Sequence, residues 1–163
     1  MLNCSGKPST SCGSEGYGPG LRYCLVDKKE ITLPGIANLA IGEVALMALD
    51  DNSAAIVARD HSGLYALSGT CPHACCTVAV CSAEACATPL VSPADCAAPV
   101  RAPLSVSGAA FLCPCHGSQF AADGSVLTGP AAARLQSVAL RKSGNDLVVD
   151  LSSPVAAATR IEA

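Results

Sequence analysis

Two short stretches of the chain combine cysteine and histidine at spacings that suit metal binding. Cys71 and His73 lie two residues apart in CPHACC, and Cys113 and His116 lie three apart in CPCHGSQF, which ends at Phe120. Together the stretches offer two thiolates and two imidazoles. Zinc accepts this donor set, and so does a 2Fe-2S cluster in which two histidines replace two cysteines on one iron. The two stretches therefore predict one shared metal centre.

The composition agrees with a metal-binding protein. The chain has 11 cysteines in 163 residues, a density that indicates an oxidising compartment, a metal centre, or both. Two of its three histidines lie in the paired stretches, and the third, His61 in RDHSG, is expected to be a solvated turn residue. The formal net charge is −3, without a cluster of Lys or Arg. Nucleic acid is therefore not expected as a partner.

The sequence lacks a recognisable membrane-spanning or export segment. It contains no apolar run of the roughly 18 residues needed to span a bilayer, and no charged region followed by an apolar one at its start. The chain as given is therefore expected to be soluble. Membrane association is expected only through an anchor upstream of Met1 or through a partner subunit.

Short strands separated by turns predict an all-β fold that positions the two stretches. The apolar runs are EITL, EVALMAL, AAIVAR and LYALS, at residues 30–33, 43–49, 54–59 and 64–68. Turn-forming segments separate them, which indicates an antiparallel meander. Farther on, SVALRKSGNDLVVDL at residues 137–151 predicts two strands joined by a hairpin at SGND.

The remaining segments set the expected domain boundaries. Residues 1–28 are rich in Gly, Ser and Pro and predict an irregular segment that contains cysteines. Residues 29–152 form the expected β domain, and residues 153–163 a weak tail, helical or loose. Within the domain, residues 77–110 carry prolines and cysteines without a sustained period, which predicts a long ordered insertion held by covalent links.

The pattern Cys-x-His-x-x-Cys followed by Cys-x-Cys-His-Gly-Ser resembles the Rieske iron–sulfur proteins, in particular the disulfide-containing, cytochrome bc-type branch. The match covers residues 71–76 and 113–120, and Gly129-Pro130 stands where that family has its proline loop. The resemblance implies a Rieske-like antiparallel β-sandwich with an inserted cluster-binding subdomain, whose loops span residues 68–80 and 111–131. It also favours a 2Fe-2S cluster over zinc, because a zinc site has no use for two further cysteines.

The resemblance also implies the ligands of that cluster. Cys71 and Cys113 would hold the inner iron, and His73 and His116 the outer iron. Neutral imidazoles in place of thiolates remove negative charge from the cluster, which raises its reduction potential.

Three further roles follow from the same resemblance. Cys76 and Cys115 would form a disulfide that joins the two loops. The Ser118 hydroxyl would donate a hydrogen bond to a bridging sulfide and raise the potential further. High-potential members of the family usually carry a tyrosine where this chain has Phe120, so one hydroxyl donor is missing and an intermediate potential within the Rieske range is expected.

The implied function is one-electron transfer without substrate chemistry of its own. The first hypothesis is the iron–sulfur subunit of a membrane quinol-oxidising cytochrome bc-type respiratory complex, with quinol and cytochrome b- or c-type proteins as partners. The alternative is the small electron-transfer subunit of a periplasmic oxidoreductase, similar to arsenite oxidase. Ala74, where the family usually has leucine, favours this alternative because that leucine helps docking on cytochrome b. A more distant alternative is a disulfide-rich zinc-binding module.

The predicted disulfide also indicates where the protein acts. A structural disulfide persists in an oxidising compartment, so the periplasm or the outer face of the bacterial cytoplasmic membrane is expected. Seven cysteines remain after two ligands and one disulfide, namely Cys4, Cys12, Cys24, Cys75, Cys81, Cys86 and Cys96. Bridges are expected among the last four and among the first three, with one thiol left over.

Overall fold

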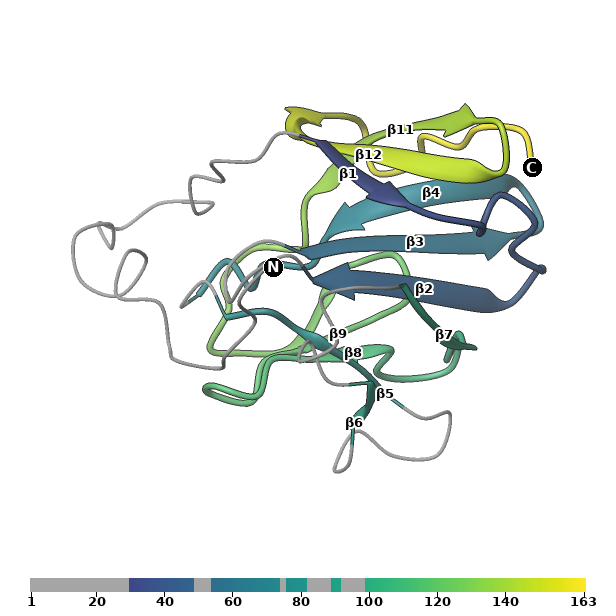
Figure 1. The fold of residues 1–163 in the computed structure, drawn as a ribbon. Helices are drawn as coiled ribbons and strands as arrows, with labels where there is room; N and C mark the ends of the chain where they lie inside the picture. The colour runs from purple at the N-terminus through teal and green to yellow at the C-terminus, as the bar shows by residue number, and fades with distance from the viewer. Residues whose placement is uncertain (1–29, 49–53, 74–75, 82–88, 92–98) are drawn as a thin grey trace.

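The computed structural model describes residues 30–48, 54–73, 76–81, 89–91 and 99–163, whose arrangement is drawn in Figure 1. Within these residues every regular element is a β-strand, and every strand pairing is antiparallel. The described part of the chain therefore offers no long apolar helix that could cross a membrane. The predicted all-β, antiparallel fold class is confirmed.

The larger of the two sheets has seven strands in the order β1-β12-β11-β4-β3-β2-β7. Their bounds are β1 Glu30–Leu33, β2 Glu43–Ala48, β3 Ala54–Asp60, β4 Gly63–Ser68, β7 Val100–Pro103, β11 Ser137–Ser143 and β12 Asp146–Pro154. The sheet bends, so that β1 and β12 lie over one face of β3 and β4 (Figure 1). We call it the main sheet.

The smaller sheet has five short strands in the order β10-β9-β8-β5-β6. Their bounds are β5 Ala79–Cys81, β6 Pro89–Val91, β8 Phe111–Leu112, β9 Gln119–Phe120 and β10 Val126–Thr128. In Figure 1 this sheet lies below β2 and β3 of the main sheet. We call it the small sheet.

The central strands of the main sheet are buried on both faces, which explains their almost uninterrupted apolar sequences. In β3, Ile56 and Ala58 enter one core, whereas Ala55 and Val57, on the opposite face, enter the other. Side chains alternate between the two faces of a strand, so each of these strands contributes to both cores. One core lies between the two sheets, and the other lies under β1 and β12.

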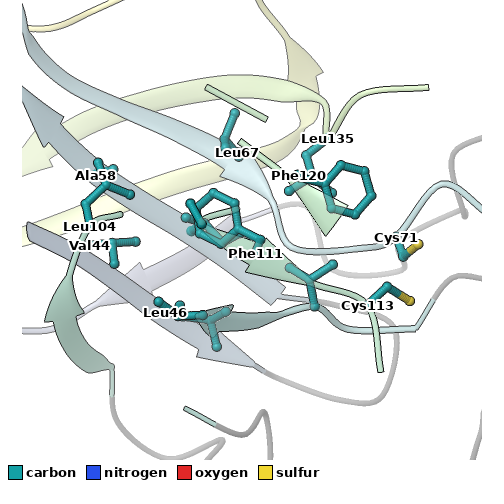
Figure 2. Close-up of a cluster of buried hydrophobic side chains, with 14 of the residues drawn as sticks. Val44, Leu46, Ala58, Leu67, Cys71, Leu104, Phe111, Cys113, Phe120 and Leu135 are labelled. Atoms are coloured by element: carbon teal, nitrogen blue, oxygen red, sulfur yellow. The ribbon is translucent and has the colours of Figure 1, made fainter. Parts of the chain in front are cut away.

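The core between the two sheets supports both of the cysteine-containing stretches. Phe111 and Phe120, opposite each other on β8 and β9, are fully buried in it. Cys71 and Cys113 belong to the same core and are also fully buried. Figure 2 shows these two cysteines at one end of the core, with their sulfur atoms directed away from Phe111. The packing of the small sheet on the main sheet therefore fixes the base of the candidate site.

One topological prediction needs correction. The predicted meander holds for β2, β3 and β4, but β1 pairs with β12 rather than with β2. The described residues of the insertion at residues 77–110 include three strands, β5, β6 and β7, and the last of these forms an edge of the main sheet. Its sequence lacks a clear period because these strands are only three or four residues long.

The C-terminal segment, residues 155–163, is docked on the main sheet and is neither helical nor loose. The backbones of Ile161 and Leu64 exchange two hydrogen bonds of 2.9 Å. The Arg160 guanidinium donates to Asp60 Oδ2 at 2.8 Å and lies over the Tyr65 ring, with Cζ 3.9 Å from the ring centroid. We refer to residues 155–163 as the C-terminal strap.

Acid is expected to weaken the docking of the C-terminal strap. Burial opposes ionisation of Asp60, but hydrogen bonds from Arg160, Ser62 and Gly63 outweigh it and hold the pKa of its carboxyl below the ordinary value. Such a group stabilises the fold above its unfolded pKa of about 4, and this contribution is lost as the pH falls through the folded pKa. Because the Asp60 side chain is 35% exposed, solvent screening limits the effect to about 1 kcal/mol or less.

Thermal unfolding of the wild-type protein and the Asp60→Asn variant between pH 3 and pH 7 would check this expectation. The two unfolding midpoints should differ most near neutral pH and converge in acid, because protonation then removes the same charge from the wild type. A difference that stays constant across the pH range would contradict it.

Candidate metal centre

The two cysteine-containing stretches form loops at one end of the small sheet. The first loop, residues 71–76, follows β4 and leads into β5, and the second loop, residues 113–118, joins β8 to β9. Strands β5 and β8 are direct neighbours, with Ala79 opposite Leu112 and Val80 opposite Phe111. Segments about 40 residues apart in sequence are therefore brought together by one strand pairing.

Each loop is closed by a hydrogen bond of the same kind. The Cys71 N–H donates to the Cys76 carbonyl, and the Cys113 N–H donates to the Ser118 carbonyl, both at 2.8 Å. The acceptor lies five residues after the donor in each case. In the second loop Gly117 has a φ of +81°, a conformation that glycine adopts without strain, and its N–H donates to the Cys113 carbonyl at 3.0 Å. Both loops therefore present their first cysteine in a fixed backbone.

The first cysteines of the two loops are buried thiols that interact with each other. The pKa of Cys113 is lowered to about 6, chiefly because the Cys71 side chain hydrogen-bonds to it. The backbone N–H groups of Cys115 and His116 and the charge of His116 act in the same direction, against the opposing effect of burial. At neutral pH the site therefore favours a thiolate at Cys113, and thiolate is the form that binds metals.

The histidines of the two loops contact each other. The rings of His73 and His116 lie edge to face, with their centroids 4.8 Å apart. His73 is half-buried and His116 is exposed. The site therefore has a buried sulfur side and an imidazole side that reaches solvent.

A disulfide joins the second cysteines of the two loops, Cys76 and Cys115, which is the pair implied by the family resemblance. The Cys113 sulfur lies within 4.8 Å of both sulfurs of this bridge. Cys81 on β5 is disulfide-bonded as well. The other residues of the predicted extra bridges, Cys75 among them, lie outside the described residues, as does Ala74.

Ser118 is fully buried beside the second loop. Its Oγ accepts a hydrogen bond of 2.9 Å from the N–H of Ala131, the residue that follows Gly129-Pro130. Because the oxygen acts as the acceptor in this bond, the hydroxyl hydrogen remains available to donate to another group. The sequence analysis identified Ser118 but missed Ala131, because a backbone N–H donor is not marked by any particular side chain. The neighbouring Gly129-Pro130 pair is the signal that could have pointed to Ala131.

The donor set fits a 2Fe-2S cluster with mixed ligands. Two adjacent buried cysteines, one of them with a lowered pKa, match the sulfur ligands, and the two contacting imidazoles match the nitrogen ligands. The same four groups would also suit zinc.

The family model described as the Rieske [2Fe-2S] domain matches residues 29–139. Among curated relatives, the cytochrome b6-f complex iron-sulfur subunit of Synechococcus elongatus is 31% identical over 118 residues, which cover 72% of this chain and 49% of the relative. The corresponding subunit of Microcystis aeruginosa is 45% identical over 47 residues, covering 29% and 26%. The chain thus spans about half the length of the first relative, and about a quarter of the second.

Solved structures include the cyanobacterial plasma membrane Rieske protein PetC3 from Synechocystis PCC 6803. It is 28% identical, with a TM-score of 0.45 and coverage of 74% of this chain and 98% of that one. A naphthalene 1,2-dioxygenase mutant bound to phenanthrene is 17% identical, with a TM-score of 0.44 and coverage of 76% and 26%.

Proposed function

Because the chain belongs to the Rieske 2Fe-2S domain family, we propose that its two loops hold the cluster of a one-electron carrier in a membrane quinol-oxidising complex of the cytochrome bc type. The observation that carries this proposal is the family match over residues 29–139, which includes both loops. The cofactor that family membership implies is a Rieske 2Fe-2S cluster. When bound, such a cluster accepts and returns one electron at a time.

We assign the ligands by position in the two loops. Cys71 and Cys113 supply the sulfur ligands, which is supported by their burial and mutual hydrogen bond. His73 and His116 supply the nitrogen ligands, which is supported by their ring contact. The exposed imidazole of His116 is the group on which a quinol hydroxyl would form a hydrogen bond, so that a proton and an electron leave the quinol at the same place.

The Cys76–Cys115 disulfide holds the second cysteines of the two loops together, so neither loop can swing away from the other. It supports a location in an oxidising compartment, which we assign to the outer face of the bacterial cytoplasmic membrane or the periplasm. The partners in this proposal are cytochrome b- and c-type proteins, and attachment to the membrane is through a partner subunit or an N-terminal anchor.

Ser118 tunes the potential in this proposal. Its hydroxyl would donate to a sulfide of the bound cluster, while its oxygen accepts the Ala131 N–H. A hydrogen bond to sulfur stabilises the more negative, reduced state, and about 1.4 kcal/mol of such a preference equals about 59 mV for a one-electron couple. We therefore expect Ser118→Ala to lower the midpoint potential by some tens of millivolts up to about 100 mV.

Protein-film voltammetry of the purified protein would measure this shift. The matched control is Ser137→Ala, which truncates a buried serine of β11 in the main sheet and should leave the potential unchanged. An equal shift in both variants would contradict a direct role for Ser118.

An EPR spectrum of the iron-replete protein, before and after ascorbate and across pH 6 to 10, tests the proposed function. A rhombic 2Fe-2S signal produced by ascorbate, with a midpoint potential that falls as the histidine ligands lose protons, is the expected result. Reduction only by dithionite, without pH dependence in this range, would overturn the quinol-oxidising role. A colourless protein that contains zinc would overturn the cluster assignment itself.

A further inference from the structure

The turn between β9 and β10, residues 121–124, is held by an unbroken row of hydrogen bonds. Each of the four carbonyl oxygens, from Ala121 to Gly124, accepts one hydrogen bond. In the order of these acceptors, the donors are the Gly124 N–H, the Tyr65 hydroxyl, the Arg134 guanidinium and the Leu135 N–H. Gly124 has a φ of +86°, and a Cβ at this position would lie 3.1 Å from the Leu135 carbonyl oxygen. The turn therefore has little freedom to shift without breaking several bonds.

One of these four donors comes from the main sheet. Tyr65 lies on β4, and its hydroxyl reaches the Ala122 carbonyl at 2.8 Å. Burial raises the pKa of Tyr65 to about 12, so the hydroxyl keeps its proton at any physiological pH. Tyr65 is thus a permanent donor that links the main sheet to the small sheet.

The C-terminal strap fixes the ring of this tyrosine. Arg160 Cζ lies 3.9 Å from the centre of the Tyr65 ring, and Arg160 Nε is held by Asp60 at 2.8 Å. Tyr65 itself is only 6% exposed. A cation over an aromatic face adds attraction to the packing, so the strap, the tyrosine and the turn form one connected unit.

The two chain segments that leave this turn meet again at Ser118. On the N-terminal side, β9 begins at the residue after Ser118. On the C-terminal side, the chain passes through β10 and Gly129-Pro130 to Ala131, whose N–H donates to Ser118 Oγ at 2.9 Å. Segment 131–135 then returns to the turn through Arg134 and Leu135. The turn is therefore connected to the serine through the chain on both sides.

We propose that Tyr65, braced by Arg160 of the C-terminal strap, is a positioning residue that fixes the Ser118 hydroxyl for its hydrogen bond to the metal centre. The inference rests on the proposed function, because Ser118 has a sulfide to address only when the cluster is bound. It adds a feature outside both loops: the main sheet and the C-terminus help to set the reduction potential. In this role Tyr65 acts through the turn and not as a ligand of the cluster.

Tyr65→Phe removes the hydroxyl and keeps the ring, so it tests the proposal with little disturbance of the core. The measurement is the midpoint potential of the cluster-loaded protein for the wild type, Tyr65→Phe, Ser118→Ala and the double variant. Tyr65→Phe is expected to lower the potential by less than Ser118→Ala does. The double variant should match Ser118→Ala alone, because Tyr65 has no route to the cluster once the serine hydroxyl is gone.

Two arginine variants complete the experiment. Arg160→Gln removes the guanidinium that packs on the Tyr65 ring but leaves the tyrosine hydroxyl in place. It should lower the midpoint potential by less than Tyr65→Phe does. Arg141→Gln removes an exposed ion pair with Glu30 at 3.2 Å on another part of the main sheet and should leave the potential unchanged. Thermal unfolding of every variant separates a loss of stability from a change in potential.

Two results would overturn this inference but not the proposed function. One is a wild-type midpoint potential in Tyr65→Phe despite a lowered unfolding midpoint, and the other is a double variant whose shift in potential equals the sum of the two single shifts. In both cases the wild-type protein would still show the Rieske signal, so the proposed function would stand. Absence of that signal from the wild type would overturn the proposed function and this inference with it.

Discussion

Replacing Cys113 by serine, or His116 by alanine, is expected to abolish the 2Fe-2S cluster almost completely. Serine is a poor substitute for a thiolate, and the two neighbouring cysteines that the structure describes, Cys76 and Cys115, are joined in a disulfide. Alanine at His116 removes one of the two imidazoles that contact each other. Iron and acid-labile sulfide content, together with the EPR spectrum, would measure the loss.

His61→Ala is the matched control for the histidine variant. His61 is exposed like His116, but it lies in the turn between β3 and β4 of the main sheet, away from both loops. This variant should retain a full complement of iron and sulfide. Far-UV circular dichroism should show that all variants keep their β structure, since none of the substituted residues lies in a strand of either sheet. A fully loaded His116→Ala protein would refute the ligand assignment.

The second large effect is expected on removal of the disulfide by Cys76→Ser combined with Cys115→Ser. The bridge joins residues separated by 39 positions, and closing a loop of this length contributes roughly 4 kcal/mol in the chain-entropy model. The proposed ligands close nearly the same loop when the cluster is bound. The loss of stability should therefore be large in the cluster-free protein and smaller in the loaded one.

Denaturant unfolding of the loaded and cluster-free proteins would measure both values, and the rate of cluster loss to an iron chelator would report on the loops directly. Cys81 is also disulfide-bonded, so treating the double variant with a reductant provides the control for bridges other than Cys76–Cys115. Equal destabilisation with and without the cluster would contradict the shared-loop argument.

The features of the fold that could be predicted are those with a local signal. Strand β4 was identified from LYALS because an apolar run bounded by turn residues is typical of a buried strand. The hairpin of β11 and β12 was identified from SGND, where Gly144 has a φ of +61°. The two loops were identified by their cysteines and histidines. All of these signals lie within a few adjacent residues.

The features that were missed depend on distant partners. The pairing of β1 with β12 joins Glu30 to Asp150, and no pattern within either strand specifies the other. The C-terminal strap was predicted to be helical or loose, because nothing in Arg160 and Ile161 themselves indicates that they bind Asp60 and Leu64. Ala131 and Ala122 contribute a backbone N–H and a backbone carbonyl to the site and to the turn. Because almost every residue carries these atoms, the sequence does not mark the residues that use them.

Because strand pairing aligns the two loops, the spacing between the proposed ligands does not depend on the length of the chain that connects β5 to β7. Strand β5 is fixed against β8 in the small sheet, and β7 is fixed against β2 in the main sheet. The segment between Cys81 and Val100 therefore joins two anchored points, and the closure entropy of such a connection changes only slowly with its length. Natural variation or protein engineering can therefore change the number of residues in this segment at a small entropic cost, while the pairings of β5 with β8 and of β7 with β2 keep the two loops aligned.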